Sequence, residues 1–226
     1  MGAFQSSLLD LVGPSGCAGQ GGVDQADADH GGVELGALDR SVDRTDLGSG
    51  AWVDLRPGWI RGSDDLFSRL ETAVPWRSER RRMYDRVVDV PRLACRYDED
   101  AALPDPALDS MLDELSRHYA AELGEPFRTV GMCWYRDGRD GVAWHGDTIG
   151  RGATEDTLVA IVSLGTPRRL SLRPRGGGRQ IGFVVGHGDL LVMGGSCQRT
   201  WDHAVLKTSR PTGARISVQF RPRGVL

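Results

Sequence analysis

The residues best suited to do chemistry are a histidine and an aspartate two positions apart, His145 and Asp147. They lie in a segment, residues 142–147, that predicts a β-strand, and on a strand their side chains share one face. A third candidate, His203, follows 56 residues after Asp147. Two imidazoles and one carboxylate form the facial triad that holds Fe(II) in non-haem sites and leaves positions open for a co-substrate and dioxygen. The sequence therefore predicts an iron site at these three residues.

The alternative is that these histidines are structural, because a histidine and an aspartate at this spacing often occur by chance. The order of the candidates favours the metal site, since His203 precedes a further predicted strand that carries two arginines. The remaining histidines have simpler interpretations. We expect His118 to lie on the polar face of a predicted helix and His187 to lie in a glycine-rich turn.

Arg215 and Arg221 are six positions apart in the last predicted strand. Because that separation is even, both side chains point to the same face of the strand. A guanidinium inside a barrel is destabilising unless it meets an anion. A dicarboxylate such as 2-oxoglutarate would supply one carboxylate for an arginine to bind with two hydrogen bonds, while its other end chelates iron. The alternative is an edge strand whose arginines face solvent.

The predicted secondary structure changes in kind along the chain. Residues 1–50 are rich in glycine, aspartate and alanine, and we expect a flexible N-terminal extension. Residues 51–126 contain helical patterns, one of them opened by Asp105 as the cap and Pro106 as the first residue. Residues 127–224 contain many short strands separated by glycine and proline turns. We predict an α+β fold, with a double-stranded β-helix (jelly-roll) core and helices packed outside it.

Composition limits the class of protein. The 226 residues suit one domain with an extension, and the net charge of −3 indicates no strongly basic nucleic-acid binder, although a local basic patch would suffice. No apolar run is long enough for a membrane span, so we expect no membrane association. The four cysteines are far apart and include no CxxC pair, which favours a reducing compartment over a disulfide framework. We therefore expect a cytoplasmic protein, and a monomer.

Five segments together resemble the AlkB-type 2-oxoglutarate- and Fe(II)-dependent dioxygenases. The similarity is firm over residues 127–224 and extends loosely to 57–59, 74–76 and 90–92, while residues 1–50 are outside it. The segments that carry the resemblance are Tyr135-Arg136-Asp137-Gly138, the pair His145 and Asp147, the run from Gly188 to Gly195, His203, and the strand from Arg215 to Arg221.

The resemblance implies an activity, oxidative dealkylation, and a role for each matching residue. In that reaction an N-alkyl carbon is hydroxylated, the product collapses to an aldehyde and the repaired base, and 2-oxoglutarate leaves as succinate and carbon dioxide. The implied cofactors are Fe(II), 2-oxoglutarate and dioxygen, and the implied partner is alkylated DNA or RNA. By position, iron would be held by His145, Asp147 and His203, the distal carboxylate of 2-oxoglutarate by Arg215 and its metal-proximal end by Arg221, with a hydrogen bond from Tyr135.

Three positions depart from the family's usual pattern. Cys133 stands where the family often has asparagine, two residues before Tyr135, and Ser217 replaces an asparagine in the arginine strand. Both changes keep the arginine clamp possible but remove amide hydrogen bonds. Ile149 stands two positions after Asp147, where members that dealkylate nucleobases frequently have an acid. The departures therefore weaken the case for base recognition more than the case for iron chemistry.

The substrate lid would be built, by position, from Trp76 and residues 91–97. Within it, Trp76, Arg92 and Tyr97 are the candidate substrate contacts. Either aromatic ring could stack on an extruded base, or it could belong to the core. An arginine cluster between Arg77 and Arg86 predicts either a phosphate-contact patch or a solvated basic face.

Three functions compete on these grounds. The first, which we favour, is dealkylation of nucleobases in DNA or RNA. The second is a hydroxylase or demethylase of the same fold that acts on a protein side chain or a small molecule, which the acidic net charge and Ile149 favour. The third is a jelly-roll binding protein without turnover, and the complete triad and the arginine pair argue against it.

Overall fold

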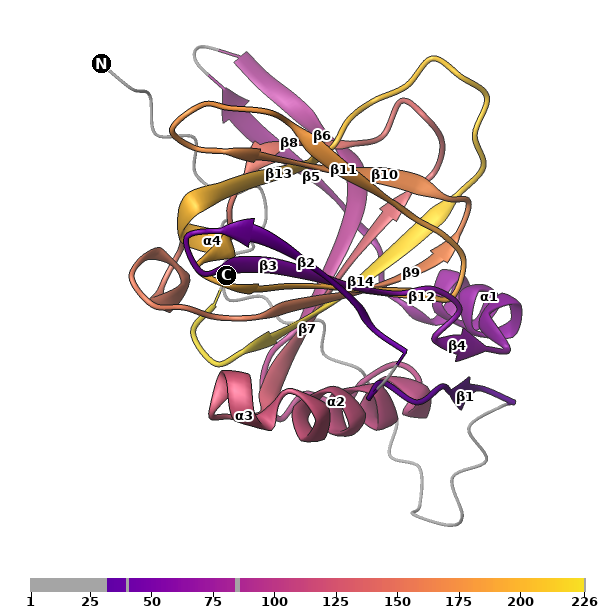
Figure 1. Cartoon of the computed structure of the whole chain (residues 1–226). Helices are drawn as coiled ribbons and strands as arrows, with labels where there is room; N and C mark the ends of the chain where they lie inside the picture. Colours follow the sequence, from indigo (N-terminus) through magenta and orange to yellow (C-terminus); the bar gives the residue numbers. More distant parts are fainter. Residues whose placement is uncertain (1–31, 40, 84–85, 226) are drawn as a thin grey trace.

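Residues 32–39, 41–83 and 86–225 are described in the computed structural model, with the backbone alone for residues 79–83 and 86–89. Two of the three antiparallel β-sheets of the described chain face each other, and helices pack on the outer face of the larger one (Figure 1). This arrangement is a jelly-roll core with helices outside, so the predicted fold class is confirmed. Most of the expected N-terminal extension, residues 1–31, lies outside the described residues.

The larger sheet has eight strands, in the order β2-β3-β12-β9-β14-β7-β6-β5. At its centre, β9 and β14 pair so that Ser163 lies opposite Ser217. The strands are β2 (Asp43–Gly48), β3 (Ala51–Arg56), β5 (Arg77–Met83), β6 (Arg86–Tyr97), β7 (Phe127–Tyr135), β9 (Val159–Gly165), β12 (Asp189–Gly195) and β14 (Arg215–Pro222).

Strand β2 corrects one expectation, because regular structure begins before Ala51. β2 pairs with β3 and places Thr45 opposite Val53. Five of its six residues are exposed, so the segment lacks the apolar alternation by which a strand is predicted. Two further short strands lie in this part of the molecule and pair with each other, β1 (Glu34–Leu35) and β4 (Ile60–Arg61).

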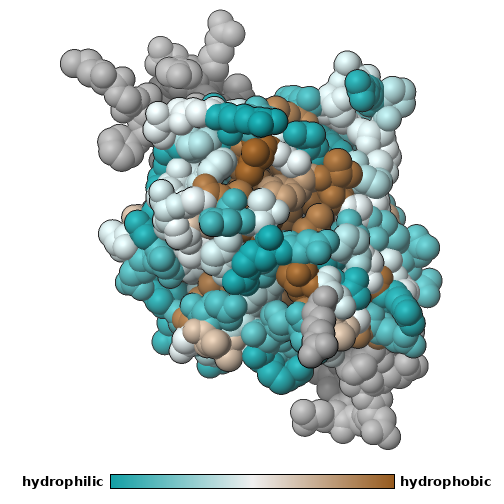
Figure 2. Space-filling model, viewed as in Figure 1, coloured by the Kyte–Doolittle hydropathy of each residue, from teal (hydrophilic) through white to brown (hydrophobic). Residues whose placement is uncertain are grey.

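The smaller sheet has four strands, in the order β11-β10-β13-β8. Apolar side chains from both sheets meet between them, among them Leu172 from the smaller sheet and Leu191 from the larger one. Figure 2 shows hydrophobic side chains gathered on the upper central part of the viewed face, with hydrophilic side chains on both sides of them. The strands of the smaller sheet are β8 (Val142–His145), β10 (Arg168–Pro174), β11 (Ile181–Val185) and β13 (Trp201–Val205).

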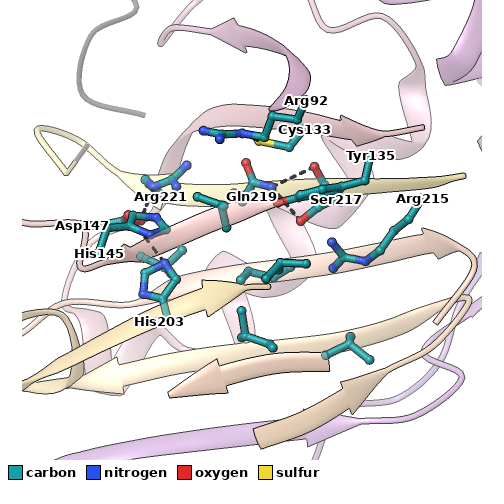
Figure 3. Close-up of a pocket in the computed structure, with 16 residues that line it drawn as sticks. Arg92, Cys133, Tyr135, His145, Asp147, His203, Arg215, Ser217, Gln219 and Arg221 are labelled. Atoms are coloured by element: carbon teal, nitrogen blue, oxygen red, sulfur yellow. Dashed lines mark hydrogen bonds and ion pairs between the residues drawn. The ribbon is translucent and has the colours of Figure 1, made fainter. Parts of the chain in front are cut away.

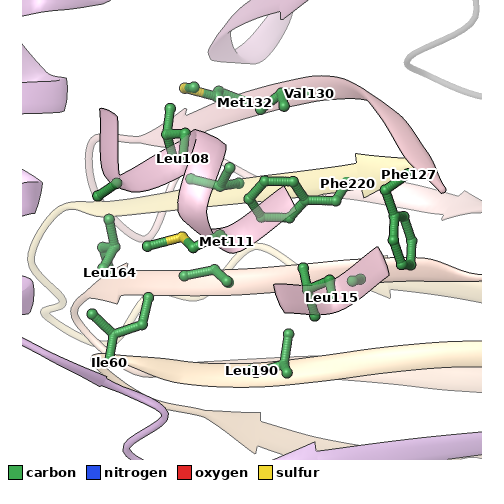
Figure 4. Close-up of a cluster of buried hydrophobic side chains, with 14 of the residues drawn as sticks. Ile60, Leu108, Met111, Leu115, Phe127, Val130, Met132, Leu164, Leu190 and Phe220 are labelled. Carbon is green, nitrogen blue, oxygen red and sulfur yellow. The ribbon is translucent and has the colours of Figure 1, made fainter. Parts of the chain in front are cut away.

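The outer face of the larger sheet is covered by α1 (Ser63–Ala73) and α2 (Pro106–His118), with the short helix α3 (Ala120–Leu123) after α2. The predicted start of α2 is confirmed: Asp105 is the N-cap, and its side chain accepts a 3.0 Å hydrogen bond from the backbone N–H of Ala107. Apolar residues of α2 are fully buried in a cluster with sheet residues such as Phe220 (Figure 4). Each such side chain contributes about 1.5–3 kcal/mol by leaving water.

Strand β14 lies in the larger sheet, between the helices on one side and the smaller sheet on the other. All eight of its residues are buried. One set of alternate side chains, Ile216, Val218 and Phe220, packs under the helices. The other set therefore faces the space between the sheets, as period-two alternation requires. That set consists of Arg215, Ser217, Gln219 and Arg221.

The hairpin formed by β5 and β6 is the outer edge of the larger sheet. β6 pairs with β7 only over its last five residues, Leu93–Tyr97, so the rest of the hairpin extends beyond the sheet (Figure 1). The backbone N–H of Gly141 donates a 2.8 Å hydrogen bond to the carbonyl of Pro91 and ties the hairpin to the start of β8. The arginine cluster lies on this hairpin, but the side chains of Arg80, Arg81, Arg82 and Arg86 lie outside the described residues.

Cys95 takes part in a disulfide, whereas Cys133 and Cys197 are free thiols. The expectation of an unbridged set of cysteines is therefore not met at Cys95. Among the described residues, no helix is long and apolar enough to cross a membrane.

Candidate active site

The pairing of β8 with β13 in the smaller sheet brings the predicted triad together. His145 is the last residue of β8 and lies directly opposite His203 of β13, while Asp147 follows two residues later. The nearest oxygen of Asp147, Oδ1, is 3.8 Å from Nε2 of His145 and 3.9 Å from Nε2 of His203. One donor atom from each residue lies within 4.8 Å of the others (Figure 3). This spacing matches a single metal ion held by three ligands.

The protonation states also suit a metal. Burial lowers the pKa of both imidazoles, and for His203 the neighbouring His145 lowers it further, to about 3. Burial alone would raise the pKa of Asp147, but Arg221 and the two histidines outweigh it and lower that pKa to about 2. At neutral pH the site therefore presents two neutral imidazoles and one carboxylate, the forms that bind metal.

Hydrogen bonds orient two of the three ligands, His145 and Asp147. Nδ1 of His145 lies 2.8 Å from the carbonyl of Ala143, so Nδ1–H donates there and Nε2 keeps its lone pair for a metal. Oδ2 of Asp147 accepts a 2.8 Å hydrogen bond from Nε of Arg221. Oδ1 of Asp147 is buried and has no hydrogen-bond partner among the described residues, which is expected of an atom that ligates a metal.

Gly146, between the two ligands, is required by space. A Cβ at this position would lie 2.8 Å from the carbonyl oxygen of Gln198 and would also meet the guanidinium of Arg175. The same Gln198 accepts a 3.1 Å hydrogen bond from the backbone N–H of Asp147 through its side-chain oxygen. The short helix α4 (Cys197–Thr200), which carries Gln198, therefore fixes the backbone of the ligand segment.

Arg215 lies at the far end of the same cavity, and its side chain is 2% exposed. Its Nε donates a 2.8 Å hydrogen bond to Oγ of Ser163, and its guanidinium carbon lies 5.3 Å from the ring centre of Tyr135. Burial raises the pKa of Tyr135 to about 12, so its hydroxyl stays protonated and can donate a hydrogen bond. Nη1 of Arg215 is buried without a hydrogen-bond partner among the described residues, which suits an anion such as a carboxylate.

Gln219 and Ser217 line the cavity between the two arginines (Figure 3). Nε2 of Gln219 donates to the backbone oxygen of Ser217 at 2.8 Å and contacts Oγ of Ser217 at 2.7 Å. Oε1 of Gln219 is buried and accepts no hydrogen bond from any described residue. An amide group is therefore present beside Ser217, the position at which the family usually has asparagine, but Gln219 supplies it.

Arg92 is the one predicted substrate contact that the structure brings to this cavity. It comes from β6, its side chain is 1% exposed, and its Nε donates to Sγ of Cys133 at 3.2 Å. Figure 3 shows the guanidinium extending past Cys133 toward the end of the cavity that holds Arg221, His145 and Asp147.

Trp76 and Tyr97 lie on the other face of the larger sheet, so the structure does not place them against the cavity. Tyr97 is 2% exposed and belongs to the core under the helices. Trp76 packs against the same core, with its ring 5.5 Å from that of Trp134. For Tyr97 the reason is the alternation of side chains along a strand. Tyr97 is five residues from Arg92 on β6, and because this number is odd, the two side chains point to opposite faces of the sheet. Of the two interpretations that the sequence left open, this packing favours the core role for both rings.

Ile149 is half-buried after β8 and is not among the residues that line the cavity. The other two described histidines lie away from it. His187 is in a turn as expected, where its Nδ1 accepts a 2.7 Å hydrogen bond from the backbone N–H of Gly165. His118 is the last residue of α2 and packs edge-on against Tyr119.

Several site residues escaped prediction. Gln219 could have been found, because it shares the even spacing of Arg215 and Arg221 on one strand. Gln198 and Ser163 carry no local signal, since their roles depend on contacts with chain segments about 50 residues away.

Comparison with known proteins places the chain among enzymes of one kind. The family model described as the 2OG-Fe(II) oxygenase superfamily matches residues 60–221. The chain is 28% identical over 198 residues to the alpha-ketoglutarate-dependent dioxygenase alkB homolog 3 of Bos taurus, an alignment that spans 76% of this chain and 68% of the relative. It is 27% identical over 196 residues to the DNA oxidative demethylase ALKBH2 of Arabidopsis thaliana, spanning 69% of this chain and 60% of that relative.

Solved structures agree on the fold. An oxidoreductase of the 2OG-Fe(II) oxygenase family from Burkholderia pseudomallei superposes with a TM-score of 0.56 at 13% sequence identity, over 76% of this chain and 86% of that one. At this low identity the superposition shows a shared fold, and the chemistry rests on the side chains described above.

Proposed function

The chain belongs to the 2OG-Fe(II) oxygenase superfamily, and from that premise we propose that it removes alkyl groups oxidatively from nucleobases of DNA or RNA. The observation that carries the proposal is the shared cavity: a buried histidine–aspartate–histidine cluster at one end and the buried guanidinium of Arg215 at the other. Its relatives named above are of the AlkB type, which supports the choice of nucleobases as substrates.

The donor set fits Fe(II). His145, Asp147 and His203 would hold the ion, with the lone acceptor Oδ1 of Asp147 as the carboxylate ligand. When bound, Fe(II) with 2-oxoglutarate and dioxygen supplies the oxidation that hydroxylates an N-alkyl carbon, after which the aldehyde leaves and the unmodified base remains. The contribution of the chain is to hold the two imidazoles neutral, to keep Asp147 ionised, and to bury all three from water.

The opposite end of the cavity would hold 2-oxoglutarate. Arg215 would pair with its distal carboxylate, because a buried guanidinium is stabilised by an anion and presents parallel N–H donors to it. Tyr135 would add a hydrogen bond from its protonated hydroxyl. Arg221 would face the metal-proximal end, where it already pairs with Asp147. The two arginines would thus set the direction in which the co-substrate lies.

The nucleic acid would approach from the side of the β5–β6 hairpin, which carries Arg92 into the cavity wall and the arginine cluster on its outer part. We propose that the cluster contacts phosphates, because basic side chains bind the backbone without regard to sequence. An alkylated base would then be extruded into the cavity, as enzymes that act on bases require.

The test is a demethylation assay on a panel of alkylated single- and double-stranded oligonucleotides, with succinate release measured in parallel. We expect both activities to depend on Fe(II) and 2-oxoglutarate and to fall by at least about 100-fold in His145→Ala. The matched control is His118→Ala, which removes a histidine that lies away from the cavity and should keep full activity.

Other outcomes would point elsewhere. Full activity in His145→Ala would overturn the assignment of the metal site. Succinate release with a protein or small-molecule substrate, together with no repair of any oligonucleotide, would favour a hydroxylase of another substrate class. Binding of 2-oxoglutarate with no turnover of any kind would favour a binding protein.

A further inference from the structure

Two uncharged side chains of β14, Ser217 and Gln219, lie in the cavity between its two arginines (Figure 3). Within the proposed function, Arg215 faces the distal carboxylate of 2-oxoglutarate and Arg221 faces its metal-proximal end. Ser217 and Gln219 are each 4% exposed. Because buried polar groups are destabilising unless they form hydrogen bonds, the bonds of these two side chains indicate what they do.

The amide of Gln219 is fixed in one orientation. Its nitrogen, Nε2, donates to the backbone oxygen of Ser217 at 2.8 Å and to the side-chain oxygen Oγ of the same residue at 2.7 Å. An amide nitrogen carries two hydrogens, so these two bonds use both. The reversed amide would place its oxygen against the backbone oxygen of Ser217, and two acceptors at that distance repel each other. The nitrogen of Gln219 therefore faces Ser217.

Gly131 of β7, which lies opposite Gln219 in the sheet, leaves room for this amide. A Cβ on Gly131 would lie 3.2 Å from Oε1 of Gln219 and 3.0 Å from Nη1 of Arg221, which is closer than such atoms normally approach. A larger residue at position 131 would therefore displace the amide. The space above Gly131 and the backbone oxygen of Ser217 together hold the glutamine in place.

The bond from Gln219 also determines what the hydroxyl of Ser217 can do. A hydroxyl has one hydrogen to donate and two lone pairs with which to accept. Since Oγ of Ser217 accepts from Gln219, its hydrogen points elsewhere, and no other side chain of the described residues forms a hydrogen bond with this oxygen. Ser163, opposite Ser217 on β9, is bonded to Nε of Arg215. The hydrogen of Ser217 is therefore available to an acceptor in the cavity.

We propose that Gln219 is a positioning residue for the co-substrate, because it makes the hydroxyl of Ser217 a donor to the distal carboxylate of 2-oxoglutarate. This inference rests on the proposed function for the identity of the co-substrate. Ser217 lies two residues from Arg215 on the same face of β14, so both can reach one carboxylate. A carboxylate has lone pairs beyond those that an arginine fork uses, and a hydrogen bond to an ionised group is stronger than one between neutral groups.

Binding of 2-oxoglutarate to the Co(II)-loaded protein tests the inference without turnover, with the absorption of Co(II) as the readout. The comparison ligand is 2-oxopentanoate, which has the same carbon chain with a methyl group in place of the distal carboxylate. A general defect of the fold weakens the binding of both ligands. A lost hydrogen bond to the distal carboxylate weakens the binding of 2-oxoglutarate alone.

We expect Ser217→Ala to weaken the binding of 2-oxoglutarate by about tenfold and to change that of 2-oxopentanoate by no more than about twofold. Gln219→Met keeps the length of the side chain but cannot donate, so it should weaken the binding of 2-oxoglutarate alone, by about three- to tenfold. In Ser217→Ala, the further change Gln219→Met should have little effect, because both residues act through one hydrogen bond. The matched control is Gln180→Met, since Gln180 is exposed and does not line the cavity.

An unchanged affinity for 2-oxoglutarate in Gln219→Met or in Ser217→Ala would overturn the inference. Equal weakening of both ligands in Gln219→Met, or additive effects in the double variant, would also contradict it. If Gln219→Met does not fold, Gln219→Leu replaces it, and Ser217→Ala by itself still decides whether the hydroxyl binds the distal carboxylate. No binding of 2-oxoglutarate by the unchanged protein would instead contradict the proposed function.

Discussion

Arg221 and Asp147 are 74 residues apart in the sequence and are joined in the folded chain by a 2.8 Å hydrogen bond from Nε to Oδ2. Asp147 is fully buried and Arg221 is 5% exposed. The bond couples the last strand of the larger sheet to the ligand segment that follows β8. It holds the carboxylate ionised and leaves its second oxygen for a metal.

Replacing Arg221 should therefore change the pH dependence of metal binding. Burial raises the pKa of Asp147 and Arg221 is the main group that lowers it, so in Arg221→Gln the carboxyl should protonate at a higher pH. We expect the acid limit of metal binding to move toward neutral pH and the affinity at neutral pH to fall by about 10–100-fold. Titration with Co(II) at a series of pH values measures both, with Arg223→Gln as the control. An unchanged pH profile would show that Arg221 does not govern the ionisation of Asp147.

Arg215 should determine the affinity for 2-oxoglutarate. Arg215→Gln removes the buried cation at the far end of the cavity, and we expect KM for 2-oxoglutarate to rise by about 100-fold while kcat at saturation changes much less. Arg215→Lys should recover part of the affinity, because it restores the charge without the fork. Arg169 is exposed and is not among the residues that line the cavity, so Arg169→Gln is the control. Equal KM values in Arg215→Gln and Arg169→Gln would rule out the assignment.

Gly146 should tolerate no side chain. In Gly146→Ala the new Cβ would lie within contact of the Gln198 carbonyl and the Arg175 guanidinium, and the ligand segment would have to shift. We expect a decrease of about 1–3 kcal/mol in the free energy of unfolding together with weaker metal binding. Thermal unfolding with and without Co(II) measures the two effects.

Gly176→Ala is the control for that substitution, because a Cβ there would have no atom within 4 Å and its backbone is not left-handed. We expect it to unfold and bind metal like the unchanged protein. Similar behaviour of the two glycine variants would mean that the space around Gly146 is not limiting.

The arginine cluster on β5 should bind phosphates. Double charge reversal, Arg81→Glu with Arg82→Glu, should weaken oligonucleotide binding and flatten its salt dependence by about 0.7 in log–log slope for each single-strand phosphate that the protein no longer neutralises. Fluorescence anisotropy across a salt series measures this. The control reverses two exposed arginines elsewhere, Arg117 and Arg128. If both double variants have the same slope, the cluster is a solvated face and not a phosphate site.

Much of this site could be predicted because its signals are local. The two-residue spacing of His145 and Asp147 and the six-residue spacing of Arg215 and Arg221 each fix the relative direction of two side chains on one strand. The structure agrees: Arg215 and Arg221 line one cavity. In the same way, Asp105 and Pro106 mark the start of α2, since capping depends only on adjacent residues.

The surroundings of each side chain could not be predicted. The alternation of side chains along a strand shows which residues share a face of the sheet, but it does not show whether helices or the other sheet cover that face. Arg92 and Tyr97 have opposite faces by their spacing, yet only the packing of helices on one side and the smaller sheet on the other sends Arg92 to the cavity and Tyr97 to the core. Likewise, the pairing of β8 with β13 brings His145 opposite His203. The residue types along the chain fix the kinds of ligand and their order. Long-range strand pairing brings these ligands together, because a contact between distant segments depends on how the sheets close around a common core.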